Sequence, residues 1–198
     1  MIDEGYVKFN CEWVKSEPLP SPDIVELNEW RTKLFRLGLI GVYPDGTGFG
    51  NVSIRIPLTN EFIVTGTQTG GIRELSGAHY TKVIAGDLDR NWLKCAGPVQ
   101  ASSESLTHLA IYQADQNVNA VVHTHHPGLW KHLLNQVPTT FPSVSYGTPE
   151  MAHEIFRLFS ETGISKEKVL VMAGHEDGVI TFGHDISEAA THLLKLIQ

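Results

Sequence analysis

The apolar positions of the chain follow two different periods, which predict a fold that mixes helices and strands. Those of the first periodic segment share one helical face: Ile24, Leu27, Leu34 and Leu37. Ser21 can cap this segment and Pro22 can occupy its first turn, since proline is tolerated where the backbone N–H has no helical partner. The pattern therefore predicts a helix that begins at Ser21 and stops near Gly38 or Gly41.

Alternation of apolar and polar residues, or a short apolar run, predicts strands in the rest of the chain. The strands predicted in this way are residues 51–56, 61–65, 81–85, 91–95, 120–125, 168–173 and 178–182. The first two, the next two and the last two are separated by short turn sequences, which indicates three β-hairpins.

Further helices are expected between these strands. They are predicted from Ser103 to just before Asn117, from Thr148 to a stop at Gly163, and from Ser187 to the end of the chain. Helices mixed with several hairpins favour an α/β or α+β layered sheet over a doubly wound parallel one. Residues 1–22 end in a proline-rich stretch and are expected to form an N-terminal arm on a single domain, residues 23–198.

Composition narrows the classes of function. The chain has 198 residues, and 15 Lys and Arg against 22 Asp and Glu give a net charge of −7. Without clustered positive charge, a nucleic-acid surface or an anionic-membrane surface is not expected. A chain of this length buries about 70% of its unfolded surface, so it needs no metal to fold, and a bound metal would be functional.

Localisation is suggested by what the sequence lacks. No apolar stretch approaches the roughly 18 residues that a membrane span needs. Cys11 and Cys95 fit no paired framework, and the first residues lack the pattern of a secretory signal. We therefore expect a cytoplasmic protein.

Histidine is the most suggestive residue type, with ten in the chain. His123 and His125 lie two apart on a predicted strand, so they point to the same face and could share one cation, whereas His126 points elsewhere. Two histidines on a half-buried strand could equally be satisfied by backbone and water. His175 follows another predicted strand and would complete a three-ligand site with an open fourth position.

Two further features could serve catalysis or anion binding. Glu104 lies in the first turn of a predicted helix, where it is either an ordinary N-terminal charge or a base aimed at a pocket, and His108 follows on the same face. The glycine-rich residues 46–51 and 65–71, with Ser102-Ser103, offer backbone N–H groups and hydroxyls suited to an oxyanion. Such loops also occur as simple turns.

Five sequence pieces, in order, carry a resemblance to a known family. They are residues 50–53, Ser102-Ser103-Glu104 with His108, residues 119–125, residues 146–150, and Gly174-His175 followed by residues 178–183. Together they resemble the class II aldolase/adducin family from about Asp23 to the C-terminus. The resemblance implies a three-layer α/β/α domain around a mixed, largely antiparallel sheet, and a C4 homotetramer with active sites between subunits.

The resemblance also implies roles for individual residues. The implied zinc ligands are His123, His125 and His175, and the implied acid/base carboxylate is Glu104. The implied phosphate-binding positions are Gly50, Asn51, Thr65, Gly66, Ser102 and Ser103. Because all three histidines remain, an active enzyme is favoured over an adducin-like structural module, a branch that has lost metal ligands.

The sequence departs from the family pattern at three places. Glu176-Asp177 lengthens the turn after His175, and residues 65–71 are richer in Gly and Thr than in fuculose aldolases. The given chain ends at Gln198, where aldolases and epimerases of the family continue into a tail with a catalytic tyrosine. Tyr146, Tyr112 or a residue of the N-terminal arm of a neighbouring subunit could take that role.

The hypothesis from sequence is a metal-dependent lyase, with Zn²⁺ or another divalent cation, acting on a small phosphorylated sugar or ketose. Aldol cleavage would pass through an enediolate that the cation stabilises. Two alternatives remain: a dehydratase of the methylthioribulose-1-phosphate type and a non-catalytic, adducin-like oligomerisation module. Epimerisation would use the same metal site.

Overall fold

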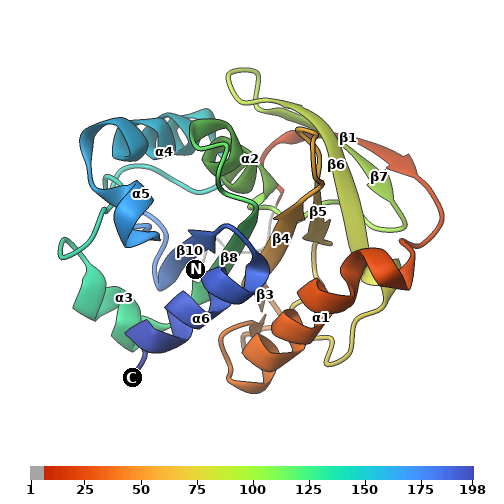
Figure 1. The fold of residues 1–198 in the computed structure, drawn as a ribbon, viewed down its shortest axis with the longest axis horizontal. Coiled ribbons are helices and arrows are strands. Elements are labelled where there is room, and N and C mark those ends of the chain that lie inside the picture. The colour runs from red at the N-terminus through yellow and green to blue at the C-terminus, as the bar shows by residue number, and fades with distance from the viewer. Residues whose placement is uncertain (1–6) are drawn as a thin grey trace.

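One eight-stranded sheet forms the middle of the molecule (Figure 1). The computed structural model describes residues 7–198. The strands of this sheet, in spatial order, are β1 (Asn10–Lys15), β7 (Trp92–Gly97), β6 (Tyr80–Asp87), β5 (Phe62–Thr65), β4 (Asn51–Arg55), β8 (Ala120–His125), β10 (Gly178–Gly183) and β9 (Val169–Val171). Neighbouring strands are antiparallel except for β1 and β7, which are parallel. A small hairpin, β2 (Gly41–Val42) and β3 (Gly48–Phe49), lies outside this sheet.

Helices cover both faces of the sheet, as Figure 1 shows. The helices are α1 (Ser21–Arg36), α2 (Ser105–Ala114), α3 (Pro127–Leu133), α4 (Pro149–Glu161), α5 (Ile164–Glu167) and α6 (Ile186–Leu196), with a 3₁₀ turn, η1 (Gly77–His79). α2 packs on α4, and α1 packs on α6. Among residues 7–198, no helix combines the length and the apolar character that crossing a membrane requires.

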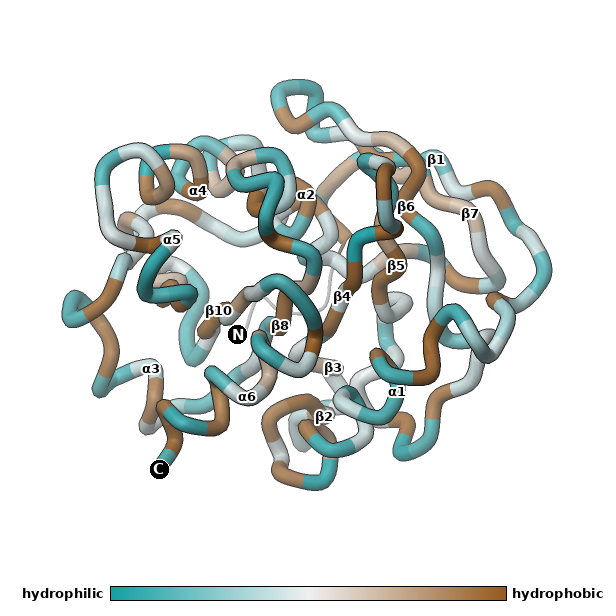
Figure 2. Tube along the Cα trace, in the orientation of Figure 1, coloured by the Kyte–Doolittle hydropathy of each residue, from teal (hydrophilic) through white to brown (hydrophobic). Residues whose placement is uncertain are grey.

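Two hydrophobic cores lie on opposite faces of the sheet. Side chains alternate along a strand, so on β8 Val121 joins the core with α2 and α4, and Val122 joins the core with α1 and α6. The central strands β8 and β10 are buried along their whole length. Figure 2 shows hydrophobic residues on the strands between the two helical layers. The expected three-layer α/β/α arrangement around a largely antiparallel sheet is confirmed.

Most predicted elements are present. α1 begins at Ser21, and the chain leaves it through Gly38, whose positive φ of 72° suits glycine. The three predicted hairpins form β4–β5, β6–β7 and β9–β10. The strand predicted over 168–173 is shorter, because the chain turns away after Val171 towards His175.

The elements that were not predicted are β1, the β2–β3 hairpin, η1, α3 and α5. β1 lies in the segment expected to be an arm, and its residues are mostly exposed because it is an edge strand. Its alternation of polar and apolar types is limited to residues 10–13, which is too short to predict a strand by itself. It brings the Cys11 Sγ to 3.6 Å from the Cys95 Sγ, although both thiols are free. α3 is short and starts at Pro127, and it was hidden behind the histidine run.

Candidate active site

Three histidines converge at one end of the central strands. His123 and His125 extend from the same face of β8, and His175 lies in the turn between β9 and β10. The Nε2 atom of His125 lies 3.1 Å from that of His123 and 3.2 Å from that of His175. All three side chains are buried, with at most 5% of any residue exposed.

This donor set fits a zinc ion. Tetrahedral zinc with Zn–N bonds of about 2.0–2.1 Å holds two nitrogen ligands about 3.3 Å apart, close to the observed spacing. Burial lowers the pKa of His123 to about 4 and lowers the pKa of His125 and of His175 well below the usual value. The imidazoles are therefore neutral, which is the form that binds metal.

Tyr43 orients one of these ligands. Its hydroxyl lies 2.8 Å from the Nδ1 atom of His125, in the turn that joins β2 and β3. A hydrogen bond at Nδ1 fixes the ring so that Nε2 faces the other two histidines. Nothing in the sequence around Tyr43 indicated this contact, because the two residues are 82 positions apart.

Glu104 places a carboxylate beside the histidine cluster. It immediately precedes α2, and only 1% of the residue is exposed. Its Oε1 atom lies 3.3 Å from the Nε2 atom of His175, while its Oε2 atom accepts a hydrogen bond from the Thr107 hydroxyl at 3.0 Å. Burial raises the pKa of Glu104 to about 7, and the charge of Lys8 and the Thr107 hydroxyl oppose that rise. Such a group can accept and release protons near neutral pH.

A small cavity of about 20 Å³ is built by the segments expected to bind an oxyanion. Its lining residues are Gly48, Gly50, Asn51, Gly66, Thr67, Gln68, Thr69, Gly70, Ser102 and Ser103. It adjoins the histidine cluster, because Asn51 pairs with His123 across β4 and β8, and Ser103 precedes Glu104. Glycine is required at position 50, where φ is +74° and a Cβ would lie 2.9 Å from the Ile40 side chain.

The structure brings most of the predicted site residues together. The predicted zinc ligands form one cluster with Glu104, and five of the six predicted phosphate positions line the cavity. Thr65 is the exception: it does not line the cavity, and its hydroxyl accepts a hydrogen bond from the Val52 N–H at 3.3 Å. The cavity also includes Thr67, Gln68 and Thr69, which belong to the glycine-rich segment 65–71 expected to suit an oxyanion but are not among the positions that the resemblance implied.

Other polar residues of the predicted site have separate positions. His126 caps α3, where its Nδ1 atom accepts a hydrogen bond from the Leu129 N–H. His108 is fully buried with its Nδ1 atom 2.7 Å from the Ser53 hydroxyl, which is also 2.7 Å from the Tyr112 hydroxyl. Tyr112 therefore belongs to a hydrogen-bonded group between α2 and β4.

Tyr146 and Lys8 lie beside the histidine cluster. The ring centroids of Tyr146 and His175 are 4.5 Å apart, and the Lys8 ammonium lies 3.8 Å from the centroid of the Tyr146 ring. Lys8 comes from the predicted arm, and its backbone carbonyl accepts a hydrogen bond from the Asn91 side chain at 3.0 Å. The segment before β1 thus contributes a positive charge to the site.

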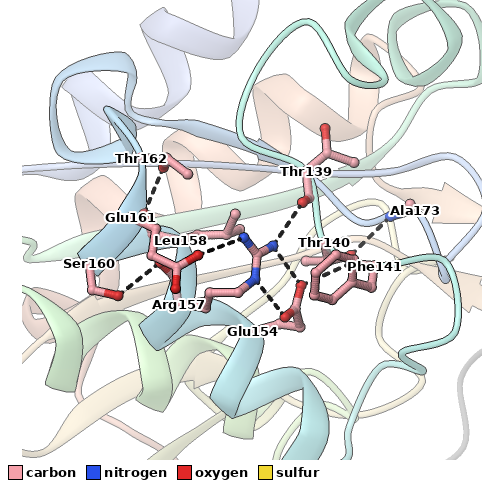
Figure 3. Close-up of polar contacts among 10 residues, drawn as sticks. All are labelled: Thr139, Thr140, Phe141, Glu154, Arg157, Leu158, Ser160, Glu161, Thr162 and Ala173. Carbon is pink, nitrogen blue, oxygen red and sulfur yellow. Dashed lines mark hydrogen bonds and ion pairs between the residues drawn. The ribbon is translucent and has the colours of Figure 1, made fainter.

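A network on the outer side holds the segment that precedes His175 (Figure 3). The Thr140 N–H donates to the Val171 carbonyl, and the Thr140 hydroxyl accepts from the Ala173 N–H, both at 3.0 Å. α4 supports this contact through Glu154, which accepts from the Phe141 N–H at 2.9 Å. The position of His175 therefore depends on α4 as well as on the sheet.

Comparison with known proteins agrees with this geometry. A sequence model of the class II aldolase and adducin N-terminal domain matches residues 44–198, more than three quarters of the chain. The L-fuculose phosphate aldolase of Methanococcus maripaludis is 28% identical over 155 residues, which cover 74% of this chain and 78% of that protein.

Solved structures show the same fold. An L-fuculose 1-phosphate aldolase superposes with a TM-score of 0.66 at 18% identity, and the match covers 90% of this chain and 84% of that one. A sugar-phosphate aldolase from Thermotoga maritima also superposes with a TM-score of 0.66, at 17% identity, covering 88% of this chain and 90% of that one.

Proposed function

The chain belongs to the class II aldolase and adducin family, and from this premise we propose that it is a metal-dependent lyase acting on a small phosphorylated sugar or ketose. One observation carries the proposal. The turn of residues 102–104 lines the anion cavity with its two serines and directs the Glu104 Oε1 atom at the histidine cluster, 3.3 Å from a ligand nitrogen. An anion site and an acid/base site are thus joined by consecutive residues of one turn.

The three histidines hold the metal in this proposal. Buried neutral imidazoles at 3.1 and 3.2 Å from one another leave room for Zn²⁺, although another divalent cation could use the same ligands. Bound Zn²⁺ supplies a Lewis acid that stabilises negative charge developing on a substrate oxygen.

Glu104 moves the proton. Its Oε2 atom is held by Thr107, so Oε1 is the atom that faces the reacting part of the substrate. Burial raises the pKa of Glu104, and this opposes the lowering that a neighbouring cation causes, so the group can first take and then return a proton. Tyr146, packed against His175, is the described tyrosine best placed to serve as a second proton donor.

The cavity binds the phosphate group of the substrate. Gly50, Asn51, Gly66, Ser102 and Ser103 line it, and they include one side-chain amide and two hydroxyls. The N-terminus of α2 lies next to the two serines and adds a favourable dipole for an anion. A phosphate bound there would leave the carbonyl end of a short sugar near the histidines.

Aldol cleavage is the reaction we propose first, because the relative from Methanococcus maripaludis is an L-fuculose phosphate aldolase. Product analysis separates the alternatives: an aldolase releases two carbonyl fragments, whereas a dehydratase yields one ketone and water. We also propose a cytoplasmic homotetramer, which light scattering on the purified protein would test.

Metal content and turnover in four proteins test the proposal. We expect one zinc per chain in wild type, in Glu104→Gln and in the control His126→Ala, whose histidine caps α3 outside the cluster. His125→Ala should lose the metal. In a screen of phosphorylated ketoses, wild type and His126→Ala should be active and the other two inactive. Stoichiometric zinc in His125→Ala, or full turnover in Glu104→Gln, would refute the assigned roles.

A further inference from the structure

Arg31 is a buried cation that makes no contact with the metal cluster. It lies on α1 with 1% of the residue exposed, and its guanidinium donates to four backbone carbonyls. Nη2 donates to Thr69 at 2.9 Å and to Gly70 at 3.0 Å, and Nη1 donates to Ile72 at 2.5 Å and to Arg73 at 3.2 Å. One side chain therefore fixes the whole segment 69–73.

That segment forms a wall of the anion cavity, through Thr69 and Gly70. Arg31 itself does not line the cavity, so it lies behind the wall. In a trans peptide the carbonyl of one residue and the N–H of the next point in opposite directions. Because Arg31 draws the carbonyls of Thr69 and Gly70 towards α1, it turns the N–H groups of Gly70 and Gly71 to the side away from α1. Those N–H groups are donors of the kind that bind an oxyanion.

The wall has little space for another arrangement. A Cβ at Gly70 would lie 2.2 Å from the Gly41 carbonyl and 3.1 Å from Gly48, so the β2–β3 hairpin presses on it from the other side. The Thr69 hydroxyl closes the turn by donating to the Gly66 carbonyl at 2.8 Å. The segment is thus held between the guanidinium and the hairpin.

The charge of Arg31 matters as well as its shape. Within the described part of the chain its polar partners are carbonyl groups, and its ring contact is Phe35, at 4.8 Å. A guanidinium stays charged in proteins even when it is buried. A positive charge one peptide layer from the cavity favours an anion in it, and it does so more strongly than an exposed charge would.

We propose that Arg31 is a positioning residue for the phosphate group of the substrate, acting through the segment 69–73 that it holds and through its buried charge. The inference rests on the proposed function, which makes this cavity the phosphate site. Residues 65–71 contain three glycines and three threonines. Arg31 explains how such a glycine-rich loop can keep one conformation.

The test measures binding of inorganic phosphate to zinc-loaded protein by calorimetry. We expect Arg31→Met to weaken the Kd at least tenfold and Arg31→Lys, which keeps the charge but not the planar fork, to weaken it less. The matched control is Arg55→Met, because Arg55 also donates to backbone carbonyls, those of Tyr112, Asp115 and Val118, away from the cavity. The control should bind phosphate like wild type, and zinc content should be equal in all four proteins.

Hydrogen exchange localises the effect. Phosphate should protect amides of residues 66–71 and 102–105 in wild type and in Arg55→Met, with less protection in the Arg31 variants. A folded, zinc-loaded Arg31→Met protein with wild-type Kd and protection would overturn the inference alone. Zinc-loaded wild type that binds no phosphate would instead overturn the phosphate site of the proposed function, and the inference with it. Should Arg31→Met not fold, wild-type Kd and protection in Arg31→Lys would overturn the role of the fork.

Discussion

Glu154 is the charged group on which the outer support of His175 depends. It accepts three hydrogen bonds: from the Phe141 N–H at 2.9 Å and from Nε and Nη2 of Arg157, each at 2.8 Å. Arg157 also donates to the Thr139 carbonyl at 3.3 Å, so the pair ties α4 to the segment that holds the strand end before His175 (Figure 3). Only 8% of the Glu154 side chain and 25% of the Arg157 side chain are exposed.

The perturbation is Glu154→Gln, which keeps the size of the side chain and removes its charge. In the place of Oε2 the amide oxygen can keep two of the three bonds, while the amide NH₂ group then faces the Nε donor of Arg157. A hydrogen bond to a charged group contributes about 1.5–3 kcal/mol, and we take the lower end because Arg157 is partly exposed, so the loss should be about 2 kcal/mol. For a chain of this size that corresponds to a fall in Tm of about 4–8 °C.

The control is Glu161→Gln on the same helix. Glu161 lies 3.5 Å from Nη1 of Arg157, but 63% of its side chain is exposed, so its pairing contributes less than about 0.5 kcal/mol. Both variants and wild type are unfolded in urea at pH 7, after removal of metal with a chelator and at one protein concentration. The two variants should differ by more than about 1 kcal/mol.

The pH dependence has a defined sign. Hydrogen bonds from Arg157 lower the pKa of Glu154, so its contribution is complete above the ordinary glutamate value and is lost as the pH falls through the lower, folded value. Wild type and Glu154→Gln should therefore converge in stability below about pH 4. Equal stability of the two glutamine variants at pH 7, or a gap that widens in acid, would refute the reasoning.

Three further variants test contacts around the metal ligands. Gly178→Ala should weaken zinc binding at least tenfold without unfolding the protein, because the new Cβ would lie 2.8 Å from the His175 ring; unchanged affinity by competition with a chromogenic chelator would contradict this. Tyr43→Phe should weaken zinc binding by about 10–100-fold through loss of the contact at the Nδ1 atom of His125, and an unchanged zinc Kd would count against that role. Ser53→Ala should cost about 2 kcal/mol in urea unfolding, because two buried groups lose a partner, while bound zinc stays at one per chain; a stability equal to wild type would rule this out.

The fold was predictable where local signals agree with tertiary packing. The Ser21-Pro22 start and the periodicity of α1 specify a helix whatever surrounds it. β4 alternates because its apolar side chains meet one core, whereas β5 is a short apolar run because both of its faces are buried. β1 escaped prediction because it is exposed at the sheet edge, and its parallel pairing with β7 depends on a partner about 80 residues away. Its existence is decided by the sheet rather than by its own sequence.

The site was predictable to the extent that its residues are close in sequence or part of a family pattern. His123 and His125 follow from strand geometry, since side chains two apart share a face. His175 was suggested by its place after a predicted strand, whereas the role of Glu104 needed the resemblance. Tyr43 and Arg31 could not be found from sequence, because a tyrosine in a turn and an arginine on a helix acquire a role only through distant contacts.

The metal cluster and the anion cavity are joined by two structural links, and this has a thermodynamic consequence under the proposed function. One link is the pairing of Asn51 with His123 across β4 and β8, and the other is the turn that carries Ser103 and Glu104. The first link joins a cavity residue to a metal-cluster residue across two hydrogen-bonded strands, and the second joins them within one turn, so ordering one end lowers the cost of ordering the other. Since linkage is reciprocal, zinc must raise phosphate affinity by the factor by which phosphate raises zinc affinity. The substrate phosphate then contributes to assembling the reacting end of the site, although it lies outside the bonds that change.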